Sequence, residues 1–216
     1  MYSSTMPLSF PAEALQQLSA LVRDIEPRAG QPRSLALASA VHEEGVSSAA
    51  FALANSLVRQ HGLRVLLVDA NLRAPSLHEL CDLPRAPGLA ELMNGGGAWQ
   101  GAAHEVQGGL TVITAGAVVE HPSRLFTGSA LQDQLTRLDG QVDWVLFDCP
   151  AVNVYPDAAA IAAACAATVL VVRSGRTRRE IVQDAKRRLE QAGASVAGVV
   201  LNRRRYYIPE ALYRWL

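Results

Sequence analysis

Residues 39–48 read SAVHEEGVSS and have the length of a phosphate-binding loop. Such a loop follows G-x-x-x-x-G-K-[ST], with alanine also common at the first position. Its backbone N–H groups surround phosphates, the lysine neutralises their charge and the hydroxyl binds Mg²⁺. The matching positions here are Ala40, Gly45, Val46 and Ser47, so the spacing is kept while valine replaces the lysine. A glycine turn followed by a serine-capped helix is an alternative explanation of the same letters.

Two carboxylates stand where apolar runs end. Asp69 closes the run VLLVD and Asp148 closes the run WVLFD. A carboxylate at the tip of a buried strand is costly unless it is paired, hydrated or near a cation. Two such tips beside a serine-bearing loop form the arrangement that positions Mg²⁺ and water for phosphoryl transfer. We therefore predict Asp69 and Asp148 as catalytic residues and Ser47 with Asp148 as magnesium ligands; the alternative is that both carboxylates only cap turns.

The elements that would position these residues alternate between short apolar runs and helix-length segments. The apolar runs, nearly continuous and rich in Val and Leu, cover residues 34–40, 64–69, 110–114, 144–148, 167–173 and 196–202. Helix-length segments lie at 47–60, 129–139, 157–166 and 178–192. This pattern predicts an α/β fold with a central, mostly parallel sheet and helices on both faces. Ligands of such sheets gather at the carboxyl ends of the strands.

Three regions are expected along the chain. Residues 1–33 carry one amphipathic helix and a linker, residues 34–202 form the main domain, and residues 203–216 form a basic, aromatic tail. The glycine-rich segment 94–109 is interpreted as a surface connector.

Composition narrows the possible functions. The formal net charge of the 216 residues is zero, which gives no argument for a nucleic-acid partner. The three cysteines are widely spaced, and neither a signal peptide nor a membrane span is apparent, so we expect a cytoplasmic protein. Of the twenty basic residues nineteen are arginine, and Lys186 is the one lysine.

Several longer stretches add to the loop. They are LLVDANLRAPSLH, GLAELMNGG, LTVITAGAVVEHPSRLF, WVLFDCPAVNVYPDA, TVLVVRSGRTRRE and VAGVVLNRRR. In this order and at these spacings, residues from about Ser34 to Asn202 resemble the cytoplasmic domain of bacterial tyrosine kinases of the polysaccharide chain-length and export family. These kinases are relatives of the MinD/ParA P-loop ATPases, so the resemblance implies a P-loop NTPase-like fold and a P-loop kinase-like domain over residues 34–202.

The resemblance implies a site, ligands and partners. The nucleotide-binding positions it implies are Gly45, Val46, Ser47, Ser48, Arg73 and Asn202, the last near the adenine. The implied ligand is ATP or ADP with Mg²⁺, bound weakly or not at all. The implied partner is a membrane polysaccharide chain-length or export protein, with self-association, which would hold the chain at the inner membrane. Tyr206, Tyr207 and Tyr213 are the implied phosphoacceptors; alternatively, the tail packs on the domain or lies at a membrane surface.

Departures from the family pattern point to a degenerate member. Val46 replaces the lysine, Glu43 replaces a loop glycine and Asn71 replaces a second aspartate. The oligomerisation motif of the family, a glutamate followed by two arginines, continues after Glu13 with glutamine and serine. We therefore predict weak or absent catalysis and a regulatory or scaffolding role. The alternatives are an active autokinase, in which Arg73 or a partner replaces the lysine, and a positioning ATPase of the MinD/ParA kind.

Overall fold

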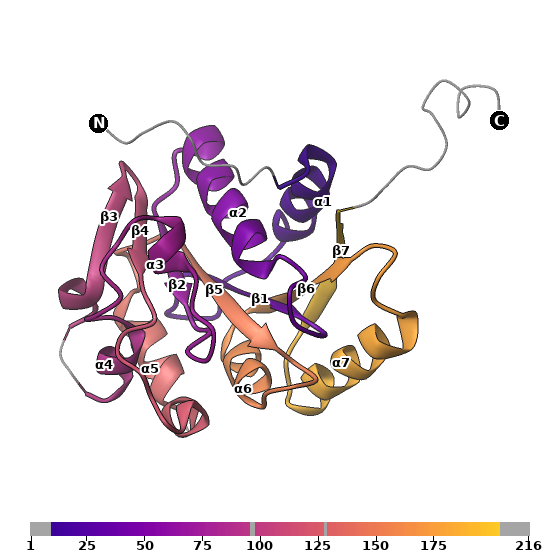
Figure 1. Ribbon diagram of the computed structural model, residues 1–216. Coiled ribbons are helices and arrows are strands. Elements are labelled where there is room, and N and C mark those ends of the chain that lie inside the picture. Colours follow the sequence, from indigo (N-terminus) through magenta and orange to yellow (C-terminus); the bar gives the residue numbers. More distant parts are fainter. Residues whose placement is uncertain (1–9, 96–97, 128, 204–216) are drawn as a thin grey trace.

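The computed structural model describes residues 10–95, 98–127 and 129–203, and within them a seven-stranded sheet. The strands are β1 (Arg33–Ser39), β2 (Val65–Asp69), β3 (Ala103–Gln107), β4 (Leu110–Ile113), β5 (Trp144–Ala151), β6 (Ala167–Arg173) and β7 (Val196–Asn202). Their order in the sheet is β3-β4-β2-β5-β1-β6-β7, and the pairing is parallel except between β3 and β4. The predicted α/β architecture is confirmed (Figure 1).

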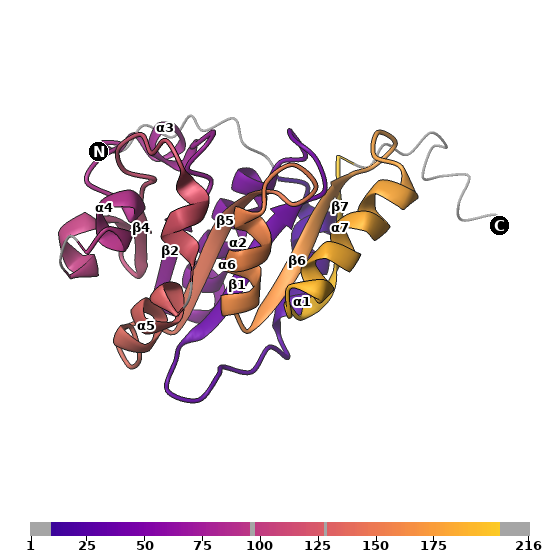
Figure 2. The same cartoon turned by 90° about the horizontal axis from the view of Figure 1, so that it is seen from below.

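Helices cover both faces of the sheet. They are α1 (Ala12–Val22), α2 (Val46–His61), α3 (Leu77–Leu80), α4 (Leu89–Met93), α5 (Ala130–Arg137), α6 (Asp157–Ala164) and α7 (Arg179–Gln191), with 3₁₀ turns η1 (Trp99–Ala102) and η2 (Pro122–Phe126). Figures 1 and 2 show α1 and α2 on one face and α5, α6 and α7 on the other. Strand alternation produces the two layers: Leu35 and Leu37 of β1 face α1 and α2, while Ala36 and Ala38 join the opposite cluster.

The prediction of a plain connector over residues 94–109 is wrong in part. Residues 103–107 form β3, which pairs antiparallel with β4 and occupies one edge of the sheet. Its sequence, AHEVQ, is short and without apolar alternation, and all five residues are partly or fully exposed. The pairing depends on β4 being next to it, which is a tertiary condition that the local sequence does not carry.

The N-terminal region is firmly attached to the rest of the described chain. Helix α1 contacts α2 and β7, and a Cβ at Gly198 of β7 would lie 2.7 Å from Leu21 Cδ2. In the linker, the Arg28 guanidinium donates hydrogen bonds to the carbonyls of Ala163 and Ala164 at the end of α6. The division at residue 33 therefore stays a prediction, and the predicted tail lies outside the described residues beyond Arg203.

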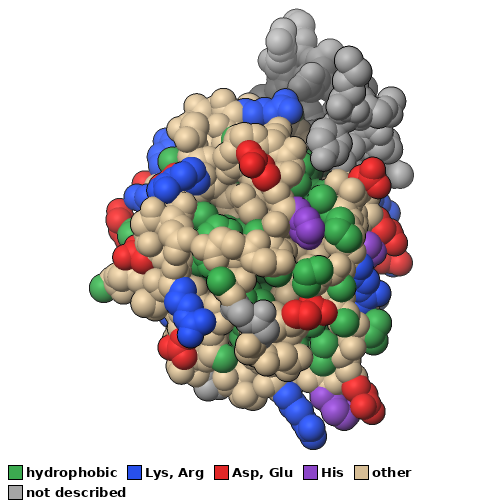
Figure 3. Space-filling model, turned by 90° about the vertical axis from the view of Figure 1, so that its left-hand side faces the viewer, with side chains coloured by type: hydrophobic (Ala, Val, Ile, Leu, Met, Phe, Trp, Pro, Cys, Tyr) green, Lys and Arg blue, Asp and Glu red, His purple; other side chains and the backbone are tan. Residues whose placement is uncertain are grey.

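The surface agrees with a balanced charge. On the face that carries β3 and β4, acidic, basic and apolar side chains are interspersed, and neither charge dominates (Figure 3). Within the described ranges, no helix combines the length and the apolar character needed to cross a bilayer.

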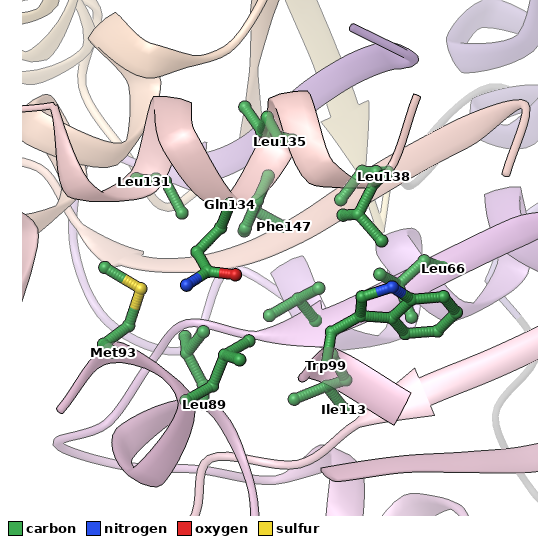
Figure 4. A pocket seen from close by; sticks show the side chains of 13 residues that line it. Leu66, Leu89, Met93, Trp99, Ile113, Leu131, Gln134, Leu135, Leu138 and Phe147 are labelled. Carbon is green, nitrogen blue, oxygen red and sulfur yellow. The ribbon is translucent and has the colours of Figure 1, made fainter. Parts of the chain in front are cut away.

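A small apolar cavity lies between the sheet, α4 and α5. Its volume is about 20 Å³, and its lining includes Leu66, Leu89, Trp99 and Leu135. Figure 4 shows these side chains converging, with the Gln134 amide among them. The packing of α5 on the sheet therefore depends on large aliphatic side chains around an existing gap.

Truncation beside this gap should be costly. Because Leu135 is fully buried, Leu135→Ala enlarges the cavity and is expected to lower the free energy of unfolding by about 2–5 kcal/mol. Ile181→Ala on α7, where the side chain is 39% exposed, is the control and should change it by less than about 0.5 kcal/mol. Urea unfolding followed by circular dichroism measures both; equal losses would contradict the assignment of α5 to the core.

Candidate functional site

The loop between β1 and α2 has the backbone shape of a phosphate-binding loop. Glu43 and Gly45 both adopt left-handed conformations, with φ of 62° and 89°. Helix α2 begins directly after Gly45, and no side chain caps it. Ser47 and Ser48 lie in its first turn, so the alternative of a serine-capped helix is wrong. Glycine at position 45 is required by space as well, since a Cβ there would lie 2.3 Å from Asn202 Nδ2.

The side chains of Val46 and Ser47 lie in different environments, one apolar and one polar. Val46 is only 8% exposed and belongs to the apolar cluster on the α2 side of the sheet. The Ser47 hydroxyl is partly buried and accepts a hydrogen bond from the Ser76 hydroxyl at 2.8 Å. The position that would hold a lysine in a phosphate-binding loop therefore contributes to the core and offers no charge.

The structure brings Asp69 and Asp148 together. The two residues are register partners, and Asp69 is the last residue of β2. Asp148 lies inside β5, because the strand continues to Ala151 beside Ser39 of β1, so the prediction that Asp148 stands at a strand tip is wrong. The Ala70 N–H donates to the Asp148 carbonyl at 2.9 Å. Asp69 Oδ2 accepts backbone hydrogen bonds from Ser76 and Leu77 at 3.0 and 2.9 Å, and its Oδ1 accepts one from Asn71. Within the described residues, neither carboxylate oxygen of Asp148 has a hydrogen-bond partner.

These contacts shift the pKa values of Asp69 and Asp148 to different degrees. Burial raises the pKa of Asp69 to about 6, although its three backbone donors and His78 lower it. Burial and the negative charge of Asp69 raise the pKa of Asp148 well above its ordinary range; the Ser47 hydroxyl lowers it but lacks hydrogen-bond geometry with either oxygen. Because Asp69 has donors and Asp148 has none, the proton that the pair retains resides on Asp148.

Arg73 lies at the same edge of the sheet but is engaged by other residues. Its Nε lies 2.9 Å from Oδ2 of Asp157, which is buried, and its terminal nitrogen donates to Ser123 Oγ at 3.2 Å. The guanidinium carbon stands 4.4 Å from the ring centre of Tyr155, and that ring meets His42 of the loop edge-on. The side chain is held in place, and its charge is shared with a carboxylate.

Asn202 contributes to the loop from β7. Its side-chain nitrogen donates to the Glu44 carbonyl at 2.8 Å, and its own carbonyl accepts from the Ser174 N–H. The sequence placed Asn202 near an adenine, and that placement stays a prediction; in the structure its amide donor is committed to the loop.

Glu44 is the site residue that the sequence reasoning missed. It is 2% exposed and its carboxylate accepts four hydrogen bonds. A glutamate in a polar loop gives no local sign of burial, because two of its four donors come from β6 and the turn after it. Its place immediately before Gly45 was the one available signal.

Asp148 and Ser47 offer oxygen ligands for Mg²⁺, but the loop lacks the positive charge that would attract a nucleotide. Mg²⁺ prefers oxygen ligands and is usually held by one or two carboxylates together with phosphate oxygens and water. Asp148, with its unpartnered buried oxygens, and the neighbouring Ser47 match that requirement. No group of three or more His, Cys, Asp or Glu side chains able to hold a metal occurs in the described part of the chain. A cation here would therefore need the phosphate oxygens of a bound nucleotide.

Comparison with known proteins identifies the lineage. Residues 33–193 match the family model described as cellulose biosynthesis protein BcsQ. The chain is also 30% identical over 173 residues to the tyrosine-protein kinase YwqD of Bacillus subtilis, covering 80% of this chain and 73% of that protein. The chain belongs to the family of BcsQ and the bacterial tyrosine kinases. Family membership confirms the resemblance drawn from the sequence motifs.

Other members of this family are much longer. The tyrosine-protein kinase ptk of Acinetobacter johnsonii is 31% identical over 148 residues, which is 68% of this chain. The chain spans about a fifth of the length of that relative, since the match covers 20% of it. The activity and partners of the whole ptk protein are therefore not transferred by the match alone.

Solved structures agree with the fold. The kinase domain of the Escherichia coli tyrosine kinase ETK superposes with a TM-score of 0.83 at 26% identity, covering 97% of this chain and 86% of that one. The septum site-determining protein MinD of Pyrococcus horikoshii, solved with Mg-ADP, gives a TM-score of 0.65 at 21% identity, with 85% and 76% covered. The second likeness shows the fold alone.

The raised pKa of Asp148 predicts a pH-dependent stability. The folded state holds the Asp148 proton more tightly than the unfolded chain, in which aspartate titrates near pH 3.9. The resulting stabilisation is complete below about pH 4 and is lost as pH rises toward the folded pKa. Asp148→Asn should therefore raise the free energy of unfolding at pH 7.5 by about 1–3 kcal/mol, with the difference fading toward pH 4.

Asp143→Asn provides a control of opposite sign. The hydrogen bond from Arg64 lowers the pKa of Asp143, so its stabilisation is present above about pH 4 and is lost as pH falls. Urea unfolding at several pH values measures both variants. A stability of Asp148→Asn that follows the wild-type protein at every pH would contradict the protonated buried carboxyl.

Proposed function

We propose that this chain is a tyrosine-kinase-like P-loop protein of polysaccharide synthesis or export that has weak or absent catalysis. It would act as a regulatory or scaffolding subunit rather than as the phosphoryl-transfer enzyme. Family membership supports the kinase-like lineage, and the description of the matching family model as a cellulose biosynthesis protein supports a role in polysaccharide assembly.

Val46 is the observation that carries this proposal. Its isopropyl group is packed in the apolar cluster beside α2, where a lysine would neutralise phosphate charge. The one lysine of the sequence, Lys186, lies on α7 and pairs with Glu190 at 3.4 Å. Loss of one charge-assisted contact costs about 1.5–3 kcal/mol, or roughly one to two decades in affinity.

The neighbouring charges support the same conclusion. Glu43 replaces a loop glycine and adds a negative side chain, which pairs with Arg176 at 3.3 Å. Arg73, the candidate replacement for the lysine, shares its charge with Asp157. Phosphoryl transfer depends mainly on positioning and charge neutralisation, so the transition state should lose more than ground-state binding does.

The partner and location are part of the proposal. A membrane polysaccharide chain-length or export protein would bind the domain and hold it at the inner membrane. ATP or ADP with Mg²⁺ would bind weakly through Ser47, Ser48 and the two aspartates. Co-purification with a co-expressed chain-length protein, and loss of membrane-bound signal without it, tests this part separately from nucleotide binding.

Restoring the loop chemistry tests the impaired site. Val46→Lys combined with Glu43→Gly returns a cation and removes a carboxylate, and the left-handed φ at position 43 suits glycine. We expect the double variant to bind Mg-ATP at least about tenfold more tightly than the wild-type chain, as measured by isothermal titration. Val46→Met with Glu43→Gly is the matched control, because it adds length without charge.

Two results would overturn the proposal that catalysis is weak or absent. One is micromolar, Mg²⁺-dependent ATP binding by the wild-type protein together with phosphotyrosine at Tyr206, Tyr207 or Tyr213, which would establish an active autokinase. The other is sustained ATP hydrolysis without phosphotyrosine, which would favour a positioning ATPase. Mass spectrometry after incubation with Mg-ATP distinguishes them.

A further inference from the structure

We infer that Glu44 is a positioning residue whose buried carboxylate holds the loop 40–48 in its anion-receiving shape. The inference deepens the proposed function, since it concerns the same P-loop frame. In an ordinary phosphate-binding loop, a lysine and the bound phosphate help to hold the loop in shape. Here the Glu44 side chain would do so.

The four hydrogen bonds to Glu44 join two separate parts of the molecule. Oε2 accepts from the N–H groups of Ala40 and Val41 at 3.0 and 3.3 Å, which closes the loop onto its own first residues. Oε1 accepts from the Arg173 N–H at 3.1 Å and from the Thr177 hydroxyl at 2.5 Å. The carboxylate therefore bridges the end of β1 and the turn between β6 and α7.

The peptide that follows this side chain is fixed from a third strand. Asn202 at the end of β7 donates to the Glu44 carbonyl, and Gly45 lacks the Cβ that would block this approach. The carboxylate and the backbone carbonyl of Glu44 therefore connect the loop to the ends of β1, β6 and β7. A buried carboxylate is tolerated only when donors satisfy it, and these four donors do so without a cation.

The adjacent carboxylate does not share this role. Glu43 has a side chain that is 76% exposed, and its pairing with Arg176 lies at the surface. Exposed pairs of this kind contribute little because water and salt screen them. Two glutamates of identical chemistry at neighbouring positions therefore provide a matched comparison, in which burial and hydrogen bonding are the difference.

A loop held in this way should be ordered before any nucleotide arrives. Backbone N–H groups of a phosphate-binding loop point toward the ligand and repel one another through their partial charges when no anion is bound. The Glu44 contacts fix the outer side of the loop, so the left-handed turns at Glu43 and Gly45 persist. Removing those contacts should loosen the loop without unfolding the sheet.

Amide hydrogen exchange of the full chain without nucleotide tests this directly. Glu44→Gln is expected to speed exchange of the amides in residues 40–48 by about tenfold or more, and to leave β5 amides unchanged. Thr177→Val should have the same effect to a smaller degree, and Thr177→Ser should restore slow exchange because it keeps the hydroxyl. Glu43→Gln should leave the loop as in the wild-type protein.

A second measurement relates the Glu44 hydrogen bonds to nucleotide binding. In the Val46→Lys, Glu43→Gly background, Glu44→Gln is expected to weaken Mg-ATP binding about tenfold at an unchanged melting temperature. Loop exchange that is unchanged, or that rises equally in β5, overturns the inference. Because the exchange arm needs no nucleotide, it decides the role of Glu44 even if the restored background fails to bind and the proposed function falls.

Discussion

The pairing of β5 with β1 on one side and with β2 on the other is the constraint on which the site depends. It aligns Asp69 with Asp148 and places the loop that follows β1 beside both carboxylates. Because all three strands are parallel, their carboxyl ends meet at one edge of the sheet. Loss of this register would separate Asp69 from Asp148, which lie 79 positions apart in the chain.

The same edge gathers three buried carboxyl groups. Asp69, Asp148 and Glu44 are buried there, and each is accommodated differently. Backbone donors satisfy Asp69, a retained proton neutralises Asp148, and four donors surround Glu44. A loop lysine would compensate such a cluster in an ordinary phosphate site, whereas here hydrogen bonds and protonation do so. The loop can therefore keep its shape without a lysine.

Arg73, the candidate replacement for the missing lysine, is held by contacts outside the loop 40–48. Arg73 is oriented by Asp157, Ser123 and the ring of Tyr155, and each contact fixes the planar guanidinium in one place. A guanidinium with these partners is positioned by its fork geometry, in contrast to the flexible ammonium of lysine. Its distance from the loop is therefore set by the turn after β2 and by α6, neither of which belongs to the loop.

The strand and helix alternation, the positions of the longer helices, the loop spacing and the absence of its lysine could be read from the sequence, because these follow from local periodicity and residue identity. The placement of Asp69 at a strand end was also readable, whereas β5 continues past Asp148 to Ala151. Three features depend on tertiary contacts: β3 pairs at the edge, Asp148 has no donor among the described residues while Asp69 has three, and Glu44 is buried. These depend on partners far away in the chain, which no local pattern specifies: the donors to one Glu44 oxygen lie on β6 and in the turn after it, about 130 residues beyond the loop.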